Sequence, residues 1–261
     1  MPIGFFDSGL GGLTVLEKAL RIMPDEDYVY YADEANIPYG EKTPEQIAQY
    51  AREAVECLRD RGCKAVVIAC NTATSVAVEE LRQRFSLPIV GIEPAVKPAV
   101  EQTGHRRILV MATPVTIRES RLKGLIASLD AEDTVDLLAM PELVRFCERE
   151  EYDSPAVRDY IRGRLRDKDP AAYSALVLGC THFNHFRAVL GDFFPETVRI
   201  IDGSMGTARR LRKLLEQRGA RGGGSGRVEY LVTGGEPAPE ALAARAGRLL
   251  DRLKRMEKEE A

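Results

Sequence analysis

Short apolar runs alternate with amphipathic stretches along the whole chain. Runs such as 3–6 and 65–69 are almost entirely apolar, which is typical of strands buried on both faces of a sheet. The stretches between them repeat apolar residues every three to four positions, as in the helix expected at 13–22. The other predicted strands are 28–32, 89–92, 107–112, 134–140, 175–178, 198–201 and 228–232, and the other predicted helices are 44–61, 74–85, 116–128, 142–150, 155–167, 182–190, 205–218 and 239–259.

Two of these segments resemble each other. Segments 66–72 and 176–182 each consist of an apolar run, a small residue, a cysteine and polar residues that begin a helix-like stretch. The cysteines are Cys70 and Cys180, and the same number of residues separates every corresponding pair. This internal repeat predicts an α/β protein with two pseudo-symmetric, Rossmann-like or flavodoxin-like halves. We expect mostly parallel sheets and a site between the halves.

The domain boundaries follow from the same pattern. We expect a first α/β domain formed by residues 1–96 plus 205–261, and a second formed by residues 97–204. The chain is expected to cross from the first domain to the second near 95–101. The closing helices then return to the first half. The glycine-rich segment 222–226 is expected to be a flexible surface loop.

Composition narrows the possible classes of protein. Apolar residues make up 44% of the chain and charged residues 30%, and the net charge is −3, so nothing points to nucleic acid. No apolar run approaches the roughly 18 residues of a membrane span, and no signal peptide is evident, so we expect a cytoplasmic protein. The five cysteines lack disulfide spacing, the three histidines lack zinc-site spacing, and no nucleotide motif is convincing. We therefore expect no metal and no cofactor.

Polar residues gather where predicted strands end, which is where ligands bind in open parallel sheets. The cysteines have two interpretations. A buried cysteine usually acts as a small apolar residue, and we expect this of Cys57, Cys63 and Cys147. Cys70 and Cys180 differ because they are paired and stand beside helix starts, where the dipole favours a thiolate. The clusters at the strand ends are Asp7-Ser8, Cys70-Asn71-Thr72, Glu93 and Cys180-Thr181-His182, and Tyr39-Gly40 can reach the same face.

Other interpretations of the polar residues and of the glycine-rich turn remain open. Asp7, Ser8, Asn71 and Thr181 are all good helix N-cap residues, and His182 can be a cap or a core residue. The glycine-rich turn 9–12 can be a phosphate cradle, although it lacks the lysine of a P-loop.

The motifs together resemble those of the glutamate racemases, within the cofactor-independent aspartate/glutamate racemase superfamily. They cover essentially the whole chain in order and are specific as a set. One departure is Asn184-His185-Phe186, where family members often carry Pro-Leu-Leu or a similar run. The matching segments are Gly4–Gly12, Tyr31-Ala32-Asp33, Pro38–Lys42, Ala69–Ala73, Gly91-Ile92-Glu93-Pro94 and Leu178–Phe183.

The resemblance implies interconversion of L- and D-glutamate without a cofactor, supplying D-glutamate for peptidoglycan. Cys70 and Cys180 would be the two acid/base residues, with Asp7 assisting Cys70 and His182 assisting Cys180. Two opposed thiols suit this reaction, since one removes the α-proton while the other returns a proton to the opposite face. The substrate-binding residues implied by the resemblance are Asp7, Ser8, Tyr39, Gly40, Asn71, Thr72, Thr181 and His182.

Two other functions stay open. One is a related two-cysteine racemase or isomerase that acts on aspartate, a hydantoin or another small acid. The other is a two-lobed module that binds an amino acid without turnover, although the paired cysteines would then have no purpose. The expected partner is a small-molecule substrate, with no nucleic acid and no membrane. A homodimer is possible, and the sequence leaves the oligomeric state open.

Overall fold

A computed structural model describes residues 1–104, 106–235 and 239–259, which form two parallel sheets. The first has the strand order β4-β3-β1-β2-β9 and the second β6-β5-β7-β8, and every neighbouring pair is parallel. The α/β prediction is confirmed. The strands are β1 (Ile3–Asp7), β2 (Tyr28–Ala32), β3 (Ala65–Ile68), β4 (Ile89–Gly91), β5 (Ile108–Ala112), β6 (Val135–Ala139), β7 (Ala175–Gly179), β8 (Arg199–Asp202) and β9 (Val228–Val232).

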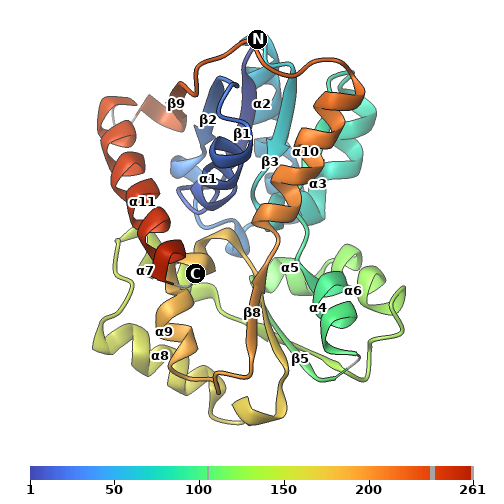
Figure 1. The fold of residues 1–261 in the computed structure, drawn as a ribbon, viewed down its shortest axis with the longest axis vertical. Helices are drawn as coiled ribbons and strands as arrows, with labels where there is room; N and C mark the ends of the chain where they lie inside the picture. The colour runs from blue at the N-terminus through green and yellow to red at the C-terminus, as the bar shows by residue number, and fades with distance from the viewer. Residues whose placement is uncertain (105, 236–238, 260–261) are drawn as a thin grey trace.

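The two sheets lie in separate halves of the molecule (Figure 1). β9 pairs with β2, so the chain returns to the first sheet after it has completed the second. The exact boundaries at 96/97 and 204/205 stay a prediction. Of the helices in the described part of the chain, none is long and apolar enough to cross a membrane.

Helices cover both faces of each sheet, as the apolar strands require. Along β1, Phe5 packs with one set of helices and Phe6 with the other, because successive side chains point to opposite faces. The helices are α1 (Leu13–Ile22), α2 (Pro44–Asp60), α3 (Asn71–Arg84), α4 (Val96–Thr103), α5 (Pro114–Arg118), α6 (Ser120–Ala127), α7 (Pro141–Glu148), α8 (Pro155–Leu165), α9 (Arg187–Gly191), α10 (Ser204–Gln217) and α11 (Pro239–Glu259).

Three expectations about helices were wrong. The predicted helix 116–128 is two helices, α5 and α6, because Glu119 between them adopts an extended conformation. The predicted helix 182–190 is a 3-10 helix, Thr181–Phe186, followed by α9. No helix was predicted at 96–103, but α4 occupies this range and so includes most of the segment 95–101, where the first crossing was expected. Its proline, Pro98, lies in the first turn, where a missing N–H costs little.

Candidate functional site

Cys70 lies between the end of β3 and the start of α3. It is the N-cap residue of α3, and its Sγ accepts a hydrogen bond from the Ala73 amide at 3.4 Å. The thiol also lies 3.8 Å from the Ser8 hydroxyl, to which it donates, and the residue is 5% exposed. The sequence prediction that Cys70 stands at a strand tip beside a helix start is confirmed.

Cys180 occupies the equivalent position in the second half, directly after β7. Its Sγ is 3.7 Å from His182 Nδ1. The other ring nitrogen, His182 Nε2, is 2.7 Å from Glu148 Oε1, and Glu148 is the last residue of α7. Glu148 was missed by the sequence analysis, because one glutamate at a helix end carries no local signal that it will meet a histidine.

Asp7 connects the two halves at the end of β1. Its Oδ1 accepts a hydrogen bond from the Gly9 amide at 2.9 Å, and its Oδ2 accepts one from the Thr181 hydroxyl at 3.1 Å. The Leu10 amide donates to Glu148 Oε1 at 3.0 Å. The turn after β1 therefore holds carboxylates from both halves of the molecule.

These hydrogen bonds decide the role of the glycine-rich turn. The amides of Gly9 and Leu10 donate to carboxylates, so the phosphate-cradle interpretation is wrong. Glycine is required here by close packing, since a Cβ on Gly11 would lie 2.4 Å from His182 Nδ1 and 2.7 Å from Thr181 Oγ1. The turn therefore forms a wall of the site.

The helix-capping interpretation is also wrong. The N-cap residues of α1 and α3 are Gly12 and Cys70, so Asp7, Ser8 and Asn71 cap neither helix. Thr181 lies inside the 3-10 helix, and its hydroxyl donates to Asp7. The Oδ1 atom of Asn71 is buried and has no hydrogen-bond partner. A buried acceptor without a donor is costly, which marks Asn71 as a residue that can receive an N–H group.

Tyr39 and Gly40 lie between the two halves. The Tyr39 hydroxyl donates to the buried Asp33 at 2.5 Å, and Asn36 donates to the same carboxylate at 2.9 Å. A Cβ on Gly40 would lie 3.1 Å from the Thr113 side chain at the start of α5. The hydrogen bonds to Asp33 fix Tyr39 within the first half, and Gly40 packs closely on the second half, on the face where the sequence analysis placed this segment.

Three buried threonine hydroxyls meet across the two halves. Thr72 Oγ1 is 2.9 Å from Thr113 Oγ1 and 3.4 Å from Thr116 Oγ1, and the last two are 3.0 Å apart. Thr72 was predicted from the sequence, whereas Thr113 and Thr116 were not. Thr113 also caps α5 by accepting from the Thr116 amide, so its sequence signal was that of an ordinary capping residue.

Glu93 takes part in a different contact. Its side chain is paired with Arg121 of α6, which also binds Glu79 of α3 at 2.7 Å. Glu93, Arg121, Asn71 and Thr116 are among the residues that line a cavity of about 270 Å³ between the halves. Among the described hydrogen bonds, none joins Glu93 to either thiol or to Asp7.

Burial dominates the electrostatics around Cys70. It raises the pKa of the Cys70 thiol to about 12, and the neighbouring Asp7 carboxylate adds to this effect, while the Ala73 amide opposes it. The amide at the start of α3 does favour the thiolate, as expected, but burial outweighs its effect. Burial also raises the pKa of Asp7, although the charge of His182 and the Gly9 amide work in the opposite direction.

His182 and Glu148 form a buried ion pair. Burial disfavours the charged imidazole, yet hydrogen bonds to Cys180 and Glu148 raise the pKa of His182 well above its ordinary value. Burial likewise works against the Glu148 carboxylate, but His182, the Leu10 amide and Arg245 hold its pKa below the ordinary range. The Cys180 side of the site thus favours an imidazolium beside the sulfur.

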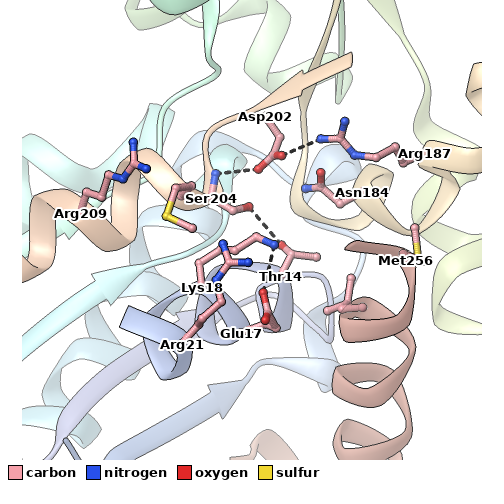
Figure 2. A pocket seen from close by; sticks show the side chains of 12 residues that line it. Thr14, Glu17, Lys18, Arg21, Asn184, Arg187, Asp202, Ser204, Arg209 and Met256 are labelled. Carbon is pink, nitrogen blue, oxygen red and sulfur yellow. Dashed lines mark hydrogen bonds and ion pairs between the residues drawn. The ribbon is translucent and has the colours of Figure 1, made fainter. Parts of the chain in front are cut away.

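Asn184 and His185 have no hydrogen bond to either thiol among those that the structure describes. Asn184 lines a second cavity, of about 310 Å³, next to Arg187, which is bonded to Asp202 (Figure 2). Its Nδ2 donates to the Thr181 carbonyl at 3.4 Å. The His185 ring stacks on Tyr152, and burial lowers the pKa of His185 to about 3, so this ring is neutral.

Comparison with known proteins places this arrangement in a family. Residues 10–211 match the Asp/Glu/Hydantoin racemase family. A glutamate racemase of Halothermothrix orenii is 48% identical over 236 residues, which is 90% of this chain and 93% of that protein. The glutamate racemase structure from Thermus thermophilus has a TM-score of 0.77 at 35% identity, covering 94% of this chain and 93% of that one. A Bacillus anthracis glutamate racemase structure has a TM-score of 0.82 at 30% identity, covering 94% and 92%. The chain therefore belongs to the Asp/Glu/Hydantoin racemase family and is an amino-acid racemase.

Proposed function

We propose that this protein interconverts L- and D-glutamate by a two-base mechanism that uses Cys70 and Cys180 and no cofactor. The observation that carries the proposal is the matched placement of the two thiols. Each follows the end of a strand, one in each half, and Asp7 and Thr181 bond directly between the same two halves. The names of the relatives support glutamate as the substrate.

Substrate binding follows from the donors and acceptors of the site. The Asn71 Oδ1 atom lacks a donor, and Asp7 supplies a second acceptor, so we assign the substrate ammonium to these two residues. That positive charge would offset the burial and the Asp7 carboxylate that raise the Cys70 pKa. The carboxylates are assigned to the remaining polar residues, which are Ser8, Tyr39, Gly40, Thr72, Thr181 and His182.

In one direction a thiolate removes the α-proton, while the opposite thiol donates its proton to the other face of the carbon. The protein finishes with the two thiols in exchanged protonation states, and the reverse reaction exchanges them again. His182 would handle the proton of Cys180, and Asp7 would do so for Cys70. The hydroxyls and amides around the carbon would stabilise the carbanion-like transition state in a site that excludes water.

The test is an assay of purified protein with L- and D-glutamate by chiral chromatography. The protein is first dialysed against a chelator, and no pyridoxal phosphate is added. We expect racemisation in both directions and a higher kcat/KM for L-glutamate than for L-aspartate. A preference for aspartate would overturn the assignment of glutamate as the substrate and leave the two-cysteine mechanism in place. Activity that requires an added cofactor would overturn the mechanism. The D-glutamate formed would serve peptidoglycan synthesis.

A further inference from the structure

Arg245 of α11 binds the carboxylate that holds His182. Its Nη2 donates to the backbone carbonyl of Glu148 and lies 3.3 Å from Glu148 Oε2. The other oxygen of the same carboxylate, Oε1, accepts from the Leu10 amide and contacts His182 Nε2. The two oxygens of Glu148 are thus divided, one facing the site and one facing α11.

The guanidinium of Arg245 contacts three glutamates. Its Nε is 3.0 Å from Glu150 and its Nη1 is 3.3 Å from Glu34, in addition to its contacts with Glu148. The Arg245 side chain is 19% exposed and the Glu148 side chain 16%. The Glu150 side chain is 32% exposed and the Glu34 side chain 13%. Partly buried carboxylates that share one partner need a cation with several donors, and a planar guanidinium supplies them in a fixed geometry.

The contact also joins the two halves of the molecule. α11 packs on β9 and α1 of the first sheet, and Figure 1 shows its far end beside α7 of the second half. Glu148 ends α7, whereas Glu34 lies after β2. Arg245 therefore holds a residue of the second half from a helix that belongs to the first.

We propose that Arg245 is a positioning residue for racemisation, acting through Glu148 on His182 and so on Cys180. This inference rests on the proposed function. Arg245 fixes Glu148 Oε2 and the adjoining carbonyl, so that Oε1 keeps a fixed position against His182 Nε2. The imidazole then presents Nδ1 to the Cys180 sulfur. A shift of about 1 Å in such a group can cost on the order of 10²-fold in rate.

The first test compares two arginines of α11. Arg248 is the matched control, because it donates to Glu150 at 3.2 Å and its side chain is 62% exposed. We expect Arg245→Gln to lower kcat about tenfold or more, with a smaller change in KM, and Arg245→Lys to recover part of the loss. Arg248→Gln should stay within about twofold of the wild type. Equal losses in the two Gln variants would overturn the inference.

The second test separates positioning from a purely structural role. In a Glu148→Gln background, the further change Arg245→Gln should cost less than about twofold, because Arg245 acts through the carboxylate already removed. Fully additive losses would overturn the inference. If Arg245→Gln does not fold, Arg245→Lys takes its place in this cycle, with the same criterion.

A spectroscopic readout does not depend on activity. The chain has three histidines, so the ring N–H resonance of His182 can be assigned by its loss in His182→Asn. Arg245→Gln should broaden or shift this resonance upfield, and Arg248→Gln should leave it unchanged. A wild-type resonance in Arg245→Gln would overturn the inference. If the wild type does not racemise glutamate, the proposed function fails, and this resonance alone decides whether Arg245 positions His182.

Discussion

The carboxylate of Asp7 and the hydroxyl of Thr181 form a 3.1 Å hydrogen bond between the ends of β1 and β7. Both residues are buried, and each lies close in sequence to a residue of a different thiol site. Ser8, which follows Asp7, contacts Cys70, while Thr181 directly follows Cys180. The bond therefore sets the position of one half of the site relative to the other, and the two thiols depend on one shared arrangement.

Removal of either thiol tests the proposed reaction most directly. We predict that Cys70→Ala and Cys180→Ala each lower kcat/KM for glutamate by about 10²–10⁴-fold or more, since each removes an acid or base that the other cannot replace. Cys57→Ala is the control, because Cys57 is a half-buried residue within α2, and it should retain wild-type activity. Circular dichroism checks that all three variants fold. A nearly wild-type rate in either of the first two would contradict the mechanism.

Asp7 and His182 should affect the two directions differently. Each is proposed to serve a different thiol, so Asp7→Asn and His182→Asn should change kcat and KM unequally for L- and D-glutamate. The equilibrium constant of a racemisation is fixed, so kcat/KM must still balance between the enantiomers. Initial rates from both enantiomers measure the four parameters for each variant. Identical proportional changes in all four would indicate that the two residues serve only structure.

The His182–Glu148 pair should make stability depend on pH. The folded-state pKa of His182 is raised above 6.5, so its contribution is full below about pH 6.5 and is lost as pH rises through the folded pKa. The pKa of Glu148 is lowered below 4.5, so its contribution is also lost as pH falls through that lower value. We predict that Glu148→Gln lowers the free energy of unfolding by about 2 kcal/mol at pH 6, and that this loss becomes smaller as the pH rises from 6 to 10.

Urea unfolding of both proteins at each pH measures this difference. Glu142→Gln is the matched control on the same helix, because the Glu142 side chain is 47% exposed and its ion pair with Arg145 spans 3.8 Å. That variant should stay within about 0.5 kcal/mol of the wild type at every pH. A loss in Glu148→Gln that does not change between pH 6 and pH 10 would contradict the charged state of the pair.

Sequence reasoning located the thiols because their positions depend on strand order alone. Parallel strands end at one edge of a sheet, so the cysteines after β3 and β7 had to reach comparable positions in the two halves. Glu148 and Arg245 could not be found in this way. They belong to helices from different halves, and they meet because α11 passes beside the end of α7. No local sequence pattern predicts this tertiary contact. The sign of the Cys70 pKa shift also depends on burial that the sequence does not show.

The close contact of Gly11 with the site gives a prediction that depends on space rather than on charge. We predict that Gly11→Ala lowers kcat/KM by about 10²-fold, because the added Cβ would lie 2.4 Å from His182 Nδ1 and must displace that ring or the turn. The same overpacking should destabilise the protein by about 1–3 kcal/mol. Gly163→Ala is the control, since a Cβ there meets nothing within 4 Å, and alanine in α8 should be neutral or stabilising by up to about 1 kcal/mol. Steady-state kinetics and thermal unfolding of both variants measure these effects. A Gly11→Ala protein with wild-type activity would show that the turn is not a tight wall of the site.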